Sequence, residues 1–412
     1  MNFLITLVLI TAPFGADPHR PDVHTVATLA GKSLKGDADA LARLRALGPE
    51  GLDVLMQVRA ELSSVPPSPS LDARAVAWDT LIDHVARQQH ASLSGLYWYT
   101  DLDAAKARAA RDHKAIVSLR LLGSLDEALS CANSRFFRAL LYPDPQVAKY
   151  LHDNVVLHWE SVHKAPKITI DLGDGRVITR TITGNSLHYM LDAKGRVVDA
   201  LPGVYGPAAF LAWLQETAPF ASRAGTLDDA PFVAARKDQH VGWKTSRLHR
   251  WQAALATLGV QVPLDEAKLR AATTDDVIQR LAEQRPGALR VDPKVAEMLD
   301  SAYPTAARAA PLAISKMAVE RPMLPWLRNL RGSVASDEVQ NDFMLHGQIA
   351  ELIRASDLVA PEPLTQGIYA NVFMTPLYDP FLGLAPADVF TAIAPSVEIK
   401  DVAGANPLGL VE

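Results

Sequence analysis

Apolar residues recur at a helical spacing near the start of the chain. Between Asp37 and Leu62 they fall on one face of two short segments, which Gly48 and Pro49 separate. We expect two helices there, and such a pair cannot bury its apolar face alone. Residues 63–70 are rich in Pro and Ser and predict a linker, whereas residues 71–90 predict another helix. This part of the chain therefore needs a neighbour to pack against.

From Leu96 the pattern changes, because short runs of β-branched and aliphatic residues now alternate with helical segments. A Gly-containing turn at 173–175 lies between two runs of alternating polar and β-branched residues, which predicts a hairpin. The order of helices and strands is typical of the α/β class. We expect helices at 101–113, 135–151 and 207–217, and strands at 115–120, 155–159, 167–172, 176–182, 187–191 and 196–201.

After a break rich in Ala, Ser and Gly at 221–227, the apolar spacing becomes helical again. Residues 371–393 mix aromatic residues with prolines and predict an irregular, aromatic-anchored end. No motif in this half indicates a chemistry. We expect helices at 241–258, 274–284, 293–303, 306–320 and 336–355.

The composition is that of a globular protein, with 49% hydrophobic and 21% charged residues. A length of 412 residues allows two or three domains. The net charge is −5, and basic residues form no block. A nucleic-acid partner is therefore not expected.

Residues 1–16 are uncharged and apolar, and they end in Pro13, Gly15 and Ala16. This pattern predicts a signal peptide and an exported protein, periplasmic or extracellular; an uncleaved N-terminal anchor is the alternative. The apolar run is short for a membrane span. No later segment approaches 18 apolar residues, so we expect no span beyond the N-terminal signal.

Cys131 is the single cysteine of the chain, so no internal disulfide can form. In an exported protein, such a thiol either seeks a partner thiol or is buried and inert. Both alternatives stay open at this point. A metal-ligating role is a weaker third possibility.

The segment around Cys131 resembles the thioredoxin superfamily, especially its exported thioredoxin-like branch. The resemblance lies in the order and spacing of several short pieces and covers about 120 residues, one domain of ordinary size. It implies an α/β thioredoxin-like core with helical N-terminal and C-terminal additions. The pieces are Trp98, Asp101–Lys106, Lys114–Leu119, Cys131–Ser134, Asp144–Val147, Gly184–Asp192, Gly195–Val198 and Gly203. The expected organisation is a signal peptide at 1–16, a helical segment at 17–95, the thioredoxin-like domain at 96–220 and a mainly helical domain at 225–412.

Two departures from the family pattern bear on function. Ser134 stands where the family has its second cysteine, and Ser186 stands where the family has a cis-proline. The resemblance implies Cys131 and Ser134 as the catalytic positions. It implies Asn185, Ser186 and Trp98 as binding positions beside them.

A Cys-x-x-Ser pair can form a mixed disulfide, but it cannot release the partner through an internal disulfide. The favoured function is therefore that of an exported binding or scaffold module whose redox centre is degenerate. We expect a protein partner and no cofactor. The alternative is a monothiol protein in which Cys131 forms mixed disulfides or senses oxidants. If the protein is an enzyme, we expect a thiol-dependent oxidoreductase of the thioredoxin type.

A cluster of His and Glu residues on the strands could bind zinc. His158 and Glu160 share one strand face, His163 follows, and His188 lies on another strand. The resemblance places strand 115–120 between those two strands, so we expect the histidines to be apart and predict no metal site. Asp342 and His346 have helical i,i+4 spacing, for which an ordinary solvated or hydrogen-bonded pair is the expected account.

Overall fold

Four helices form the N-terminal part of the computed structural model, which describes residues 20–62, 69–181, 184–284, 334–357, 359–379 and 382–383. The expected pair at 37–62 is confirmed, and the second helix begins at Gly48. The helix ahead of this pair was not expected; Asp22 caps it by accepting a hydrogen bond from the backbone N–H of Thr25. The bounds are α1 Val23–Ser33, α2 Ala38–Ala46, α3 Gly48–Leu62 and α4 Pro69–Ala86.

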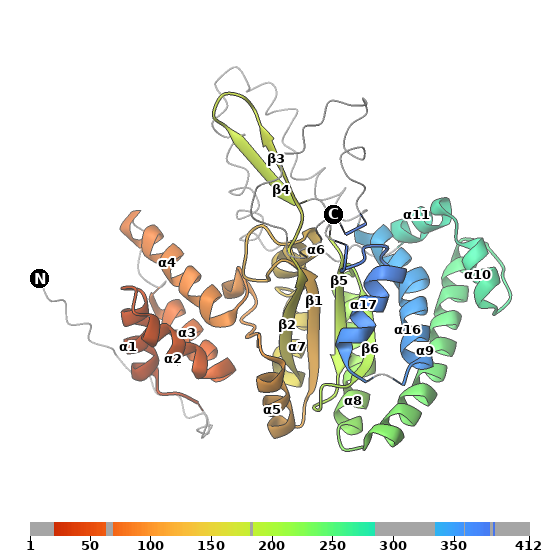
Figure 1. Ribbon diagram of the computed structural model, residues 1–412, viewed down its shortest axis with the longest axis horizontal. Coiled ribbons are helices and arrows are strands. Elements are labelled where there is room, and N and C mark those ends of the chain that lie inside the picture. Colours follow the sequence, from red (N-terminus) through yellow and green to blue (C-terminus); the bar gives the residue numbers. More distant parts are fainter. Residues whose placement is uncertain are drawn as a thin grey trace, which may run out of the picture.

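A four-stranded mixed sheet forms the centre of the molecule, and its strand order is β2-β1-β5-β6 (Figure 1). Strand β1 runs parallel to β2 and antiparallel to β5, and β6 runs antiparallel to β5. Strands β3 and β4 form a separate antiparallel hairpin, as expected. The α/β class is therefore confirmed. The bounds are β1 Ala115–Leu122, β2 Val155–His163, β3 Lys167–Asp171, β4 Val177–Thr181, β5 Ser186–Leu191 and β6 Val197–Pro202.

Every residue of β1, β5 and β6 is buried, because helices cover both faces of the central sheet. Val117 and Leu119 belong to the core that includes α7 (Pro145–Asn154) and α8 (Pro207–Ala224). Ile116 belongs to the core on the opposite face. The helices of that face are α5 Leu102–Asp112, α16 His346–Ala355 and α17 Pro361–Asn371.

The C-terminal helices pack beside the β6 edge of the sheet (Figure 1). Trp251 stacks on Phe343, with 5.1 Å between ring centroids and 4° between planes. Helix α9 begins at Asp229, well before the expected 241, and α10 and α17 were not expected. The helices predicted at 293–303 and 306–320 lie outside the described residues, as does the predicted signal peptide. The remaining bounds are α9 Asp229–Thr257, α10 Glu266–Ala272, α11 Asp275–Gln284 and the π-helix η4 Asn341–Leu345.

Arg120 holds α17 against the sheet. Its side chain is almost completely buried in β1, and its Nη2 lies 3.2 Å from Glu362 Oε1 at the start of α17. Its Nη1 lies 3.1 Å from Glu160 Oε2 on β2. A buried guanidinium requires such compensation, because an unpaired charge in the interior is strongly destabilising. This cluster fixes the C-terminal part of the chain over the sheet.

No helix among the described residues is both long enough and apolar enough to cross a membrane.

Candidate functional site

Cys131 caps the helix α6 (Ala132–Phe136), which follows β1 after an intervening loop. Its Sγ accepts a hydrogen bond from the backbone N–H of Ser134 at 3.4 Å, and its side chain is 0% exposed. Ser134 is equally buried, and its Oγ lies 2.7 Å from Ser130 Oγ and 2.8 Å from the Cys131 carbonyl oxygen. Both positions implied as catalytic therefore lie inside the protein and make local hydrogen bonds that fix the start of α6.

Arg138 fixes the loop that precedes Cys131. It lies in the π-helix η2 (Phe137–Leu141), and its Nη1 donates to the carbonyl oxygens of Leu125 (3.0 Å) and Glu127 (2.7 Å). The same nitrogen lies 3.0 Å from Ser130 Oγ. Burial lowers the pKa of Arg138 to about 10, so it remains charged at neutral pH. One buried cation thus ties residues 125–130 of this loop to the helix after the thiol.

Ser186 lies beside the turn that follows Cys131. Asn133 Nδ2 donates a hydrogen bond to Ser186 Oγ at 3.0 Å. The approach is close, because a Cβ atom on Gly184 would lie 2.9 Å from Asn133 Oδ1. No cis peptide bond occurs among the described residues. We call residues Cys131–Ser134 the thiol turn. The structure therefore brings Ser186 next to the thiol turn through a side-chain hydrogen bond.

Asn185 contacts the C-terminal part of the chain instead. Its Nδ2 donates to Thr375 Oγ1 at 2.8 Å, and its carbonyl oxygen accepts from the Tyr369 hydroxyl at 3.3 Å. Burial raises the pKa of Tyr369 well above its ordinary value, and the nearby Cys131 adds to the effect. We call residues 361–379, which carry Tyr369 and Thr375, the C-terminal cover. This cover closes the surface at which Asn185 was expected to meet a ligand.

Trp98 lies in the main hydrophobic core, which also contains Cys131. Its Nε1 donates to Gln88 Oε1 at 2.7 Å, and its ring is 5.2 Å from that of Tyr142. The Tyr142 hydroxyl is hydrogen-bonded to His188 Nε2 at 2.8 Å, and burial lowers the pKa of His188 to about 3. Trp98 therefore supports the thiol turn from inside and presents no exposed surface.

The two histidines weighed as metal ligands lie on strands separated by β1, as expected, because His158 pairs with Ser118 and His188 pairs with Leu119. His158 Nδ1 lies 2.8 Å from Ser118 Oγ. Burial and the charge of Arg120 lower the pKa of His158 to about 3. Within the ranges that the structure describes, no group of three or more His, Cys, Asp or Glu residues could hold a metal ion.

A second polar cluster surrounds Asp199 on β6. Its Oδ2 accepts hydrogen bonds from Trp213 Nε1 and from His346 Nε2, both at 2.9 Å. The sequence pairs His346 only with Asp342, because Asp199 is 147 positions away in the chain. An Asp–His pair can serve as a general base. However, the space beside it measures about 10 Å³, enough for roughly one water molecule. This cluster therefore supports packing rather than substrate binding.

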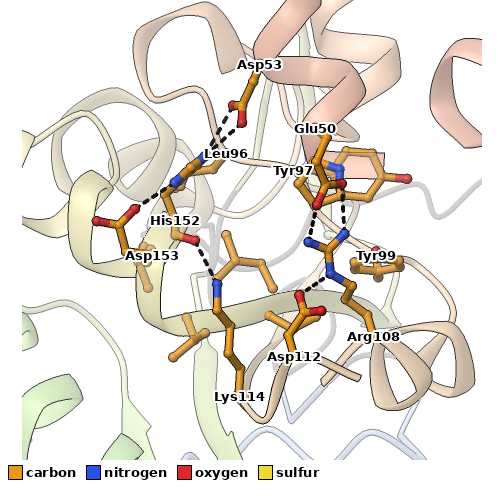
Figure 2. A pocket seen from close by; sticks show the side chains of 15 residues that line it. Glu50, Asp53, Leu96, Tyr97, Tyr99, Arg108, Asp112, Lys114, His152 and Asp153 are labelled. Atoms are coloured by element: carbon orange, nitrogen blue, oxygen red, sulfur yellow. Dashed lines mark hydrogen bonds and ion pairs between the residues drawn. The ribbon is translucent and has the colours of Figure 1, made fainter. Parts of the chain in front are cut away.

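A cavity of about 440 Å³ lies where the N-terminal helices meet the sheet (Figure 2). Helix α3 reaches across it with two carboxylates, Glu50 and Asp53, which lie three positions apart. Glu50 Oε2 accepts from Arg108 on α5 at 3.0 Å, and Asp53 Oδ1 lies 3.2 Å from His152 Nε2 on α7. Figure 2 shows the side chains of Lys114 and Asp112 between these two bridges. No local sequence pattern indicates this site, because its residues come from four separate segments.

No protein-family model matches the chain, and no curated protein or solved structure matches it either.

Proposed function

We propose that this protein is an exported, thioredoxin-like binding module whose thiol serves a structural purpose. The observation that carries the proposal is the state of Cys131, which is completely buried and accepts the N–H of Ser134 at the start of α6. A thiol must reach its partner as a thiolate to exchange disulfides, so a buried thiol is inert. Ser134 provides no second thiol for release.

Three features support the thioredoxin-like assignment. The central strand β1 is parallel to β2 and is followed, after a loop, by a helix that begins at the cysteine. Strands β5 and β6 continue the sheet in antiparallel order and lead into α8. Ser186, at the start of β5, contacts the turn after Cys131 through Asn133. These contacts support the proposed resemblance of the thiol turn, and of the strand opposite it, to the thioredoxin pattern.

A protein partner is favoured by the hairpin β3–β4, which extends beyond the end of the central sheet (Figure 1). It carries exposed apolar side chains at Ile170, Leu172 and Val177, the last of which is 57% exposed. Ile170 and Leu172 share one face of the hairpin, whereas Val177 pairs with Asp171 and lies on the other face. Exposed apolar side chains on a projecting hairpin favour an interaction surface.

A monothiol function is the second candidate, and one observation favours it. The Cys131 sulfur lies at a helix start and accepts a backbone N–H, and helix starts are a common position of reactive cysteines. This function requires the C-terminal cover to move away from the thiol turn. The two candidates therefore differ in whether the native protein exposes the sulfur.

Incubation of the native protein with glutathione disulfide distinguishes them. The scaffold proposal predicts no mass increase from a glutathione adduct until denaturant is added, when Cys131 reacts. The Cys131→Ser variant serves as the control for modification elsewhere. An adduct that forms on the folded protein at neutral pH would overturn the proposal and favour the monothiol function.

A further inference from the structure

The cavity between α3, α5 and α7 has the properties of a small-molecule site that is separate from the thiol turn. Its volume of about 440 Å³ falls within the range of roughly 300–1,000 Å³ typical of ligand pockets. It lies at the N-terminal ends of β1 and β2, whereas Cys131 follows the C-terminal end of β1.

The carboxylates that line this cavity all have cationic partners. Glu50 and Asp112 both bind Arg108, and Asp112 also accepts from Arg111 Nε at 2.8 Å. On the other side, Asp53 and Asp153 both bind His152, and Asp153 also pairs with Lys149 at 2.6 Å. These partners raise the pKa of His152 to about 9, so its imidazole is charged at neutral pH. The cavity has little unmatched negative charge to offer a cationic ligand.

Lys114 is the exception among the charged groups of the cavity. Its Nζ lies 3.5 Å from the carbonyl oxygen of His152, which is at the limit of a hydrogen bond. In the part of the chain that the structure describes, no ion pair joins Lys114 to a carboxylate. An ammonium group has three donors, so most of the hydrogen-bonding capacity of Lys114 is available in the cavity. When Arg111 and Lys149, which lie outside the lining, are counted with the carboxylates that they pair, the charge of Lys114 remains for a ligand to match.

The rest of the lining is apolar and rigid. Leu96 and Tyr97 come from the segment before α5, Leu151 comes from α7, and Val156 and Leu157 come from β2. These side chains belong to well-packed cores, so the wall is formed before any ligand binds.

We propose that this cavity binds a small organic carboxylate with a flat apolar body, and that Lys114 pairs with the carboxylate group. The apolar wall provides the contact area, while Lys114 provides a charge-assisted hydrogen bond. The bridges from Glu50 and Asp53 hold α3 over the bound molecule.

Isothermal titration calorimetry with three probes of similar size, each a phenyl ring with one polar group, tests the proposal on the full chain. Benzoate carries the expected charge, benzyl alcohol is neutral, and benzylamine is cationic. The proposal predicts saturable binding of benzoate and weaker binding of the other two. Equal binding of all three, stronger binding of benzylamine, or no binding of benzoate would overturn it.

Variants of Lys114 locate the site. Lys114→Met keeps the length of the side chain without its charge, and it is expected to weaken benzoate binding about tenfold or more, because a hydrogen bond to a charged group is lost. Lys114→Arg should retain binding. Lys35→Met, at an exposed position outside the cavity, is the matched control. If Lys114→Met fails to fold, the three-probe comparison on the unmodified chain still decides. Unchanged benzoate affinity in a folded Lys114→Met variant contradicts the proposal.

Discussion

Asn185 and Thr375 are 190 positions apart in the chain, yet their side chains form a 2.8 Å hydrogen bond beside the thiol turn. Tyr369 reinforces this contact by donating its hydroxyl to the Asn185 carbonyl oxygen. The segment before β5 is thus joined to the C-terminal cover. The surface around Cys131 is closed by the protein itself.

Removing the Tyr369 ring is expected to open this cover. Tyr369→Ala deletes a completely buried aromatic side chain, so we expect a loss of about 3–5 kcal/mol of folding free energy and faster alkylation of Cys131 by iodoacetamide. Mass spectrometry of the native protein follows the labelling. Tyr369→Phe, which loses only one hydrogen bond, should change the rate far less. Tyr378→Ala removes an exposed tyrosine and is the matched control. Equal labelling of Tyr369→Ala and wild type would show that the ring does not shield the thiol.

Substitutions at Cys131 separate its capping contact from any thiol chemistry. Serine is a good helix N-cap, so Cys131→Ser should retain the hydrogen bond to the Ser134 N–H and remain within about 1 kcal/mol of wild type. Cys131→Ala loses the cap and should be less stable than Cys131→Ser by about 1 kcal/mol. Urea unfolding followed by circular dichroism measures both. Identical stability of the two variants would argue against a capping role.

Asp199 is expected to make the free energy of unfolding decrease at acidic pH. Its buried carboxylate is held charged by His346, His240 and Trp213, which keep its pKa well below the ordinary value despite burial. A carboxylate with a lowered pKa in the folded state stabilises above its unfolded pKa, and this contribution is lost as the pH falls through its folded pKa. Asp199→Asn should therefore cost about 3 kcal/mol at neutral pH and weaken the acid dependence. Asp238→Asn, at an exposed position on α9, is the control, and denaturant titrations at several pH values decide. A neutral effect of Asp199→Asn would contradict this account.

His152 is expected to make the free energy of unfolding decrease at alkaline pH. Its hydrogen bond to Asp53, and to a smaller extent its hydrogen bond to Asp153, raises its pKa to about 9. The resulting stabilisation is fully present below the unfolded pKa of about 6.5 and is lost as the pH rises through about 9. Because the side chain is half exposed, solvent screening limits the effect to about 1 kcal/mol or less. Between pH 7 and 10, the free energy of unfolding should decrease more for wild type than for His152→Gln. Parallel curves for the two proteins would contradict a raised pKa of His152.

The strands were predictable from the sequence, because buried β-branched runs and a glycine turn are local signals. The observed β1, β2, β5 and β6 agree with the expected ranges within a few residues at each end. Helix α17 was missed, since three prolines or glycines and few apolar residues give Pro361–Asn371 a weak helical pattern. What positions this helix is the ion pair between Arg120 and Glu362, across 242 positions.

The candidate sites were predictable only in part. The spacing of short pieces of the sequence indicated Cys131, Ser134 and Ser186, and the structure places these three residues in one region. Burial could not be read from the sequence, because the residues that cover the thiol come from α17 and the segment after it. The cavity around Lys114 was equally hidden, since contacts across 58 and 99 positions form its two bridges.

The rate of Cys131 alkylation in the folded wild-type protein, measured from about pH 4 to 10, tests the central claim most directly. A structural thiol predicts negligible labelling across this range under native conditions, and rapid labelling once denaturant unfolds the protein. Rapid native labelling with a titration midpoint well below the free-thiol value of about 8.5 would contradict the claim, because it would show an accessible and activated thiolate.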